Sequence, residues 1–291
     1  MSAKGLLFID ANQYLDLYQI AEASELLPAL EEQRDHILVT TQIVDEVLRR
    51  KVYATSVGRN IQFEKLSLPK NGKDVEKTKE EFKKQSHELL LQVSQSKDEV
   101  SSGLADLFAR AVTPTEDEIG RAKLRKAFGN PPGKPRGALG DQVSWEQLLS
   151  QCRDKPKLWI ITKDSDYGTV HEGKMFLNAA LYQELAGLYR SEPTVFCFDN
   201  ITDGIEHFAE TTGAKAEHLP SRKKAEEIKE EQRSLPPLGW LNNYDDSAHI
   251  AIQSTYSWGD SILLTAALRS HIVSEEVIPP PATEEADKAG T

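Results

Sequence analysis

The chain has 291 residues, of which 39% are hydrophobic and 28% charged, a balance typical of one large globular domain or one domain with appendages. Its 35 basic and 46 acidic residues give a net charge of −11, which argues against binding of nucleic acid through bulk positive charge. No apolar run approaches the roughly 18 to 20 residues of a membrane span. The N-terminus lacks a secretory signal, and Cys152 and Cys197 form no C-x-x-C pair, so we expect a cytoplasmic protein without a membrane partner.

Four short, uninterrupted apolar runs predict buried strands of a parallel sheet, because both faces of such strands are covered. They are Leu6–Ile9, Ile37–Val39, Leu158–Ile161 and Val195–Phe198. Helical spacing of apolar residues follows three of these runs, for example at Ile43, Val44, Val47 and Leu48. Strands that alternate with helices predict an α/β fold with a mainly parallel sheet flanked by helices.

Residues 66–136 differ from the rest of the chain, because they are rich in Lys and Glu and poor in β-branched residues. Helical spacing occurs around Leu89 and Val93 and again around Leu104 and Leu107. We therefore predict a helical insertion between the second and third strands. The Pro and Gly content of Gly129–Gly137 predicts a loop at its end.

The domain boundaries follow from composition. We expect the α/β domain to span residues 1–213 and residues 214–278 to form a C-terminal extension or small subdomain. The mixed Lys and Glu residues of Ser221–Gln232 predict a charged helix with a solvated face. The composition of residues 279–291 predicts a disordered tail.

Two aspartates follow predicted strands. Asp10 comes directly after Leu6–Ile9, and Asp164 follows Leu158–Ile161 after two further residues. Ligand sites of open α/β sheets gather at the carboxyl ends of the strands, so both carboxylates are expected on the same edge. An aspartate in such a place is also common as a helix cap or a turn residue, and for each residue alone both interpretations stay open.

Two further acids lie on predicted helices. Glu46 is at the edge of the apolar stripe of the helix that follows the second strand, where a surface role is the common alternative. Asp141 lies one turn before an apolar stripe that begins at Trp145. There a carboxylate either interacts with the helix dipole or projects over the edge of the core as a functional group.

Four segments, in this order along the chain, resemble PIN-domain nucleases: FIDANQYLDLY, TTQIVDEVLRR, GDQVSWEQLL and WIITKDSDYG. The G-D-x-x-x-W-E form and the long helical insertion are similar to a larger bacterial branch of PIN-like proteins, and the resemblance covers roughly residues 4–210. It implies a small Rossmann-like sheet and a metal-dependent ribonuclease. By motif position it places the acidic quartet at Asp10, Glu46, Asp141 and Asp164, with Asp166 as an additional acid, Thr162 as a polar position and Glu146 as a weaker candidate.

Such a set of acids also suits metal-dependent hydrolysis of a phosphodiester, independently of the family resemblance. Oxygen ligands suit Mg²⁺ or Mn²⁺, and Mg²⁺ commonly bridges carboxylates to substrate phosphates. A bound ion makes a water easier to deprotonate and neutralises charge that builds on the phosphate, so no covalent nucleophile is required.

Basic residues gather ahead of Asp141. Arg121, Lys123, Arg125 and Lys126 lie in the predicted helical insertion, and Lys134 and Arg136 lie in the loop that follows. The cluster is either a solvated helix face or a patch that guides RNA to the acids. The run Arg49–Lys51 is a second candidate for such a patch, and Tyr167 could stack on a base or pack in the core.

The segment Gly168–Met175 has the pattern G-x-x-x-x-G-K, but Met175 stands where a phosphate-binding loop needs Ser or Thr. We therefore do not expect a nucleotide site there.

The function that these observations predict is a metal-dependent endoribonuclease. Two alternatives stay open: a PIN-fold RNA-binding or assembly module without turnover, and a metal-dependent phosphohydrolase that acts on small phosphate esters. The four acids favour an enzyme, since a pure binding module has little reason to gather carboxylates that repel one another. The sequence leaves open a homo-oligomer and a protein inhibitor or partner.

Overall fold

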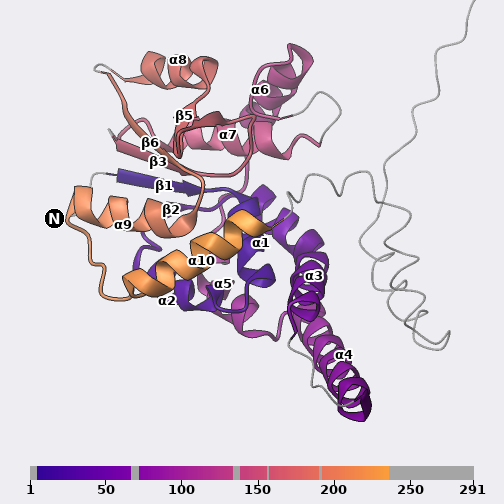
Figure 1. The fold of residues 1–291 in the computed structure, drawn as a ribbon. Helices are drawn as coiled ribbons and strands as arrows, with labels where there is room; N and C mark the ends of the chain where they lie inside the picture. The colour runs from indigo at the N-terminus through magenta and orange to yellow at the C-terminus, as the bar shows by residue number, and fades with distance from the viewer. Residues whose placement is uncertain (1–4, 67–71, 134–137, 156, 190–191, 236–291) are drawn as a thin grey trace, which may run out of the picture. The chain divides into compact units, whose positions relative to one another are not determined.

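A four-stranded parallel sheet in the order β2-β1-β3-β6 lies at the centre of the computed structural model (Figure 1). Its strands are β1 (Gly5–Ile9), β2 (Ile37–Leu38), β3 (Lys157–Ile161) and β6 (Thr194–Phe198). Both central strands are buried along almost their whole length, as their continuous apolar sequences require. The four predicted strands and the predicted α/β class are therefore confirmed.

The structure describes residues 5–66, 72–133, 138–155, 157–189 and 192–235. Three sequence predictions lie outside these ranges: the basic residues Lys134 and Arg136, the part of the C-terminal extension beyond residue 235, and the tail at 279–291. The chain up to Pro236 forms one compact unit, to which the following description applies.

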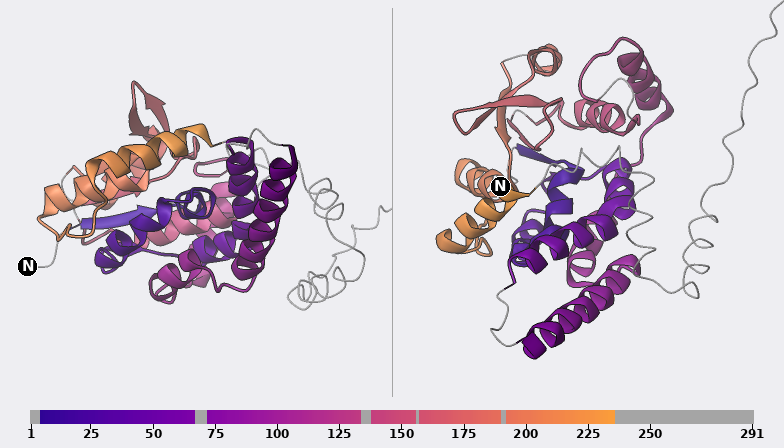
Figure 2. Two further views of the ribbon diagram at one scale, coloured as in Figure 1. Left: turned by 60° about the horizontal axis from the view of Figure 1, so that its bottom comes forward. Right: turned by 45° about the vertical axis from the view of Figure 1, so that its right-hand side comes forward.

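Helices fill the connections between the strands and extend beyond them. They are α1 (Ala11–Gln19), the 3₁₀ helix η1 (Ala23–Leu26), α2 (Leu27–Glu32), α3 (Thr41–Glu64), α4 (Gly72–Ser94), α5 (Glu99–Phe108), α6 (Glu116–Ala127), α7 (Gly140–Gln151), α8 (Ala179–Leu188), α9 (Ile201–Thr212) and α10 (Arg222–Ser234). The chain between β2 and β3 includes α4, α5 and α6, which lie in the segment where the sequence predicts a helical insertion. Figures 1 and 2 show α3 and α4 side by side, reaching away from the sheet.

The two faces of the sheet bury different aromatic clusters, because successive side chains of a strand point to opposite faces. On one face Trp159 of β3 packs edge-on against Phe208 of α9, with 4.9 Å between the ring centroids. On the other face Phe8 of β1 packs against Tyr167 at 6.0 Å, and Tyr167 packs against Trp145 of α7 at 6.1 Å. Helix α7 is thereby fixed to the face of the sheet that Phe8 covers.

A two-stranded antiparallel hairpin follows Tyr167 and was not predicted from the sequence. It consists of β4 (Gly168–His171) and β5 (Lys174–Leu177). The two residues of its turn, Glu172 and Gly173, have φ angles of 49° and 73°, as a type I′ turn requires. The G-x-x-x-x-G-K pattern therefore lies in this hairpin.

Helix α10 packs on the domain; the sequence predicted a charged helix with a solvated face here, within a C-terminal extension or small subdomain. Its residues Ala225, Ile228 and Gln232 are buried. The side-chain amide of Gln232 donates a hydrogen bond of 2.8 Å to the buried carboxylate of Asp16 in α1. The compact unit consequently includes this helix and extends beyond the boundary that we placed at residue 213.

The contact between α1 and α3 depends on a glycine, which yields a prediction about stability. A Cβ atom at Gly58 of α3 would lie 2.2 Å from the backbone carbonyl oxygen of Gln19. We expect Gly58→Ala to lower the free energy of unfolding by about 1–3 kcal/mol, the usual cost of overpacking, in a denaturant titration.

The matched control is Gly120→Ala in α6, where a Cβ would meet nothing within 4 Å. This substitution should stabilise the protein by about 0.5–1 kcal/mol, because alanine loses less backbone entropy in a helix. Equal effects of the two substitutions would contradict the close approach of α1 and α3.

Candidate active site

Asp10 lies where β1 ends and α1 begins. One of its carboxylate oxygens accepts a hydrogen bond of 2.8 Å from the backbone N–H of Ala11 and so caps the helix. The other accepts hydrogen bonds from the hydroxyl of Thr162 at 2.6 Å and the side-chain amide of Asn12 at 2.5 Å. Both interpretations of Asp10 therefore apply together: it caps a helix, and it presents a buried carboxylate at the edge of the sheet.

The turn after β3 is organised by hydroxyl and carboxylate acceptors. The hydroxyl of Thr162 accepts a hydrogen bond of 3.0 Å from the backbone N–H of Asp164, and Asp164 in turn accepts one of 3.0 Å from the N–H of Asp166. The side-chain oxygen of Asn12 accepts a hydrogen bond of 3.3 Å from the N–H of Lys163. Sequence reasoning missed Asn12, although its place two residues after Asp10 in the first turn of a helix was a usable signal.

Glu46 and Asp141 come from helices whose N-terminal ends are joined. The hydroxyl of Thr40, which caps α3, forms a hydrogen bond of 2.9 Å with the hydroxyl of Ser144 in α7. Asp141 lies in the first turn of α7. Glu46 lies in the second turn of α3 and forms an ion pair of 3.1 Å with Arg50. Both acids are thus held near the edge at which β1 and β3 end.

The four acids interact electrostatically around Asp10. Burial, followed by repulsion from Asp141, raises the pKa of Asp10 well above its ordinary value, and Glu46 and Asp164 raise it further. The hydrogen bond from Thr162 opposes these effects. Electrostatic repulsion therefore links Asp10 to acids from three other segments of the chain, and their action as one site stays a prediction.

Tyr167 lies under this group of acids, and its pKa is raised well above the ordinary value by burial and by the same four carboxylates. Its ring is 1% exposed and packed between Phe8 and Trp145. A ring in this position cannot stack on a base, so Tyr167 is a core residue, the alternative that the sequence left open.

The donor set suits a hard divalent cation such as Mg²⁺ or Mn²⁺. Asp10, Glu46, Asp141 and Asp164, with Asp166 nearby in sequence, offer oxygen ligands only, and a cation among them would offset the repulsion that raises the pKa of Asp10. Within the described residues, no three His, Cys, Asp or Glu side chains approach closely enough to form a ready-made metal cage. Mg²⁺ needs no such cage, because it usually binds through one or two carboxylates and keeps several waters.

The basic residues of α6 do not form one exposed patch. The arginines form ion pairs with glutamates, and Lys123 is exposed. Arg125 is buried and pairs with Glu146 and Glu184, each at 2.7 Å. Arg121 also pairs with Glu146, at 2.8 Å. Arg125 therefore joins α6 to α7 and α8 and is withdrawn from solvent, whereas Arg121 joins α6 to α7 with 41% of its side chain exposed, and Lys123 is exposed. Glu146, which sequence reasoning placed as a weaker candidate for the acidic site, instead pairs with both arginines and is the central anion of this network.

The second basic run, Arg49–Lys51, does not form a continuous basic patch on the surface. Lys51 is buried, and its ammonium group donates hydrogen bonds of 2.6 Å and 2.9 Å to the hydroxyls of Ser96 and Ser101. Arg50 pairs with Glu46. Of the three residues, Arg49 alone is exposed.

The arrangement defines an α/β domain whose parallel sheet carries an acidic, oxygen-only site at the carboxyl edge of its strands. A family model described as PIN domain matches residues 7–167, more than half of the chain, and the chain belongs to this family, which is of the nuclease type. The segment spans all four acids. Comparisons with curated proteins and with solved structures gave no match. Among the described residues, no helix is both long and apolar enough to cross a membrane.

The ion-pair network predicts a large loss of stability when Arg125 is truncated. Arg125→Ala would leave Glu146 buried with a weaker partner set, so the free energy of unfolding should fall by about 3–5 kcal/mol in a denaturant titration. Lys123→Ala, on the exposed side of the same helix, should change it by less than about 0.5 kcal/mol. A small effect of Arg125→Ala would show that the network contributes no more than surface ion pairs do.

The raised pKa of Asp10 predicts how stability depends on pH when chelator is present. Its ionised form destabilises the fold above the raised pKa, and this penalty disappears as the pH falls towards the unfolded value of about 3.9. Asp10→Asn keeps the acceptor that caps α1 and removes the charge. The variant should therefore gain stability relative to the parent at pH 8, and the gain should shrink as the pH is lowered to about 4.

Asp45→Asn, on the exposed side of α3, is the control and should leave the difference from the parent independent of pH. Thermal melts across the pH range provide the measurement. A difference between Asp10→Asn and the parent that does not change with pH would remove Asp10 from the repelling group.

Proposed function

We propose that the protein is a metal-dependent endoribonuclease that hydrolyses RNA phosphodiester bonds at the site around Asp10. The observation that carries the proposal is the buried Asp10 carboxylate at the end of β1, which the Thr162 hydroxyl at the end of β3 orients at 2.6 Å and which Asp141, Glu46 and Asp164 repel. Such an arrangement costs stability, and a binding module without turnover would gain nothing from it. Membership of a nuclease-type family supports the same conclusion.

Each part of the chain around the site has a role in this proposal. Asp10, Glu46, Asp141 and Asp164 would hold the metal, with Asp166 assisting. When bound, Mg²⁺ or Mn²⁺ supplies an activated water and neutralises charge on the phosphate. Thr162 orients one oxygen of Asp10 through its 2.6 Å hydrogen bond, and the α1 N-terminus fixes the other.

RNA would be bound without a strongly basic surface. The net charge is −11, and two arginines of the expected patch are engaged with Glu146. We infer that phosphate recognition depends chiefly on the metal, with Lys123 and Lys126 of α6 as the described residues of that patch that could assist. Binding to RNA should then depend on divalent cation more than on these lysines.

The activity assay uses purified protein and a labelled single-stranded RNA. Mn²⁺ or Mg²⁺ should support internal cleavage, and chelator should stop it. Asp141→Asn should lower the rate about 100-fold or more, because a metal contributes several kcal/mol to stabilisation of the transition state. Asp45→Asn, on the exposed side of α3, should cleave at the parent rate.

Three outcomes would contradict the proposal. Undiminished cleavage by a folded Asp141→Asn variant would indicate a contaminating nuclease or a different site. RNA binding without cleavage under all metal conditions would indicate a binding module. Hydrolysis of a small phosphate ester with no action on RNA would indicate a phosphohydrolase.

A further inference from the structure

A buried carboxylate outside the acidic quartet contacts the turn that carries Asp164. Asp16 of α1 is 3% exposed, and one of its oxygens lies 2.5 Å from the ammonium group of Lys163. The side-chain amide of Gln232 in α10 donates a hydrogen bond of 2.8 Å to the same oxygen. A buried charge is costly without partners, and these two residues supply them. None of the three residues belongs to the proposed metal ligands.

Helix α1 holds Lys163 at two points. Asn12 and Asp16 are four residues apart and therefore lie on the same face of the helix. The side-chain oxygen of Asn12 accepts a hydrogen bond of 3.3 Å from the backbone N–H of Lys163, and Asp16 pairs with the ammonium group of the same residue. Both the backbone and the side chain of Lys163 are consequently bound to α1.

Lys163 lies between two residues that act at the acidic site. Thr162, before it, donates to Asp10 at 2.6 Å, and Asp164 follows it. The N–H of Asp164 donates to the Thr162 hydroxyl at 3.0 Å, and the N–H of Asp166 donates to the Asp164 carboxylate at 3.0 Å. These hydrogen bonds determine the internal shape of the turn, whereas the contacts of Lys163 with α1 join the turn to the helix that begins after Asp10.

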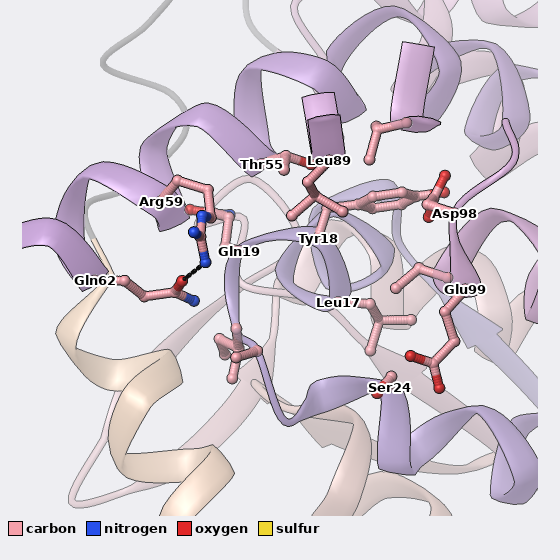
Figure 3. A pocket seen from close by; sticks show the side chains of 14 residues that line it. Leu17, Tyr18, Gln19, Ser24, Thr55, Arg59, Gln62, Leu89, Asp98 and Glu99 are labelled. Carbon is pink, nitrogen blue, oxygen red and sulfur yellow. Dashed lines mark hydrogen bonds between the residues drawn. The ribbon is translucent and has the colours of Figure 1, made fainter. Parts of the chain in front are cut away.

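Helix α1 is itself held at both ends. At its N-terminus the Asp10 carboxylate caps it through a hydrogen bond of 2.8 Å. At its C-terminus it approaches α3 so closely that a Cβ atom at Gly58 would lie 2.2 Å from the backbone oxygen of Gln19. Figure 3 shows Gln19 at this end of the helix beside Arg59 of α3. Helix α1 therefore provides Lys163 with a fixed partner.

We propose that Lys163 is a positioning residue of the acidic site: its ion pair with Asp16 holds the turn so that Asp164 and Asp10 bind the same cation. The proposal rests on the proposed function, because it assumes that these two acids are metal ligands. Groups that orient the ligands of a metal without touching the metal commonly contribute about 10- to 100-fold to its affinity. The anchor includes Gln232, which lies beyond the family-matched residues 7–167.

Electron paramagnetic resonance of Mn²⁺ measures the affinity of the full chain for the metal in the absence of RNA. The parent should bind Mn²⁺, and Lys163→Met should bind it about tenfold more weakly or worse, because the turn loses its anchor. Electrostatics alone predicts the opposite sign, since removal of a positive charge beside the acids favours binding of a cation.

The matched control is Lys229→Met, which removes a different ion pair of α10. Lys229 pairs with Asp203 of α9 and so also joins α10 to the rest of the domain. This variant should bind Mn²⁺ as the parent does. An equal loss of affinity in Lys229→Met and Lys163→Met would show that any loosening of α10 has this effect, and would overturn the proposal.

A double variant separates positioning from stability. Lys163→Met alone leaves the Asp16 carboxylate buried without its cation and should lower the melting temperature. Addition of Asp16→Asn removes the second charge, restores the net charge of the parent and keeps an acceptor for Gln232, so the melting temperature should rise again. The double variant should still bind Mn²⁺ about tenfold more weakly or worse. Parent affinity in the double variant would show that the ion pair serves stability only, and would overturn the proposal.

RNA cleavage by the parent distinguishes failure of this proposal from failure of the proposed function. Cleavage by the parent, together with parent affinity for Mn²⁺ in the double variant, would leave the nuclease standing and remove Lys163 from its site. A parent that binds no Mn²⁺ would overturn the cation site and the role of Lys163 with it. Weakened Mn²⁺ binding in the double variant, without cleavage of RNA by the parent, would support the positioning role and contradict the ribonuclease.

Discussion

The pairing of β1 with β3 sets the geometry on which the acidic site depends. In this parallel register Ile9 lies opposite Ile161, so that the next residues, Asp10 and Thr162, leave the sheet side by side. The N–H of Asp10 donates to the carbonyl oxygen of Ile161 at 2.9 Å, and the Thr162 hydroxyl donates to the Asp10 carboxylate at 2.6 Å. A slip of one residue would turn each side chain to the opposite face and would separate the two groups.

The turn after β3 is also held from its other side. Lys163, between Thr162 and Asp164, forms an ion pair of 2.5 Å with the buried carboxylate of Asp16, to which Gln232 of α10 also donates. Burial raises the pKa of Asp16, and the pairing with Lys163 opposes that effect. Helix α10 therefore supports the turn that carries Asp164, which gives this helix a part in the site.

Asp141 depends on a different framework. Arg125 of α6 joins Glu146 of α7 to Glu184 of α8, and the indole N–H of Trp145 donates to Glu184 at 2.8 Å. Loss of one partner from such a buried ion-pair network lowers the free energy of unfolding. The network therefore holds α7 in its position on the sheet. Charged residues away from the acidic site thus fix the helix on which one of its acids is carried.

Much of the fold could be predicted because its signals are local. Continuous apolar runs identified all four strands of the sheet, and the strand ends placed Asp10 and Asp164 on one edge. The hairpin at Gly168 was missed, because its short alternating strands are half exposed and its turn signal is a single Glu-Gly pair. The role of Arg125 could not be read from the sequence, since its partners lie 21 and 59 residues away and a basic helix face looks the same whether or not it is buried.

The central claim is that Asp10, Glu46, Asp141 and Asp164 act as one cation-binding site. Anomalous diffraction from crystals of the full chain that contain Mn²⁺ tests this claim most directly. The account predicts a manganese peak bound by Asp10 and at least one of the other three carboxylates, and loss of that peak in crystals of Asp10→Asn. A peak bound only by other residues, or one that persists unchanged in Asp10→Asn, would contradict it.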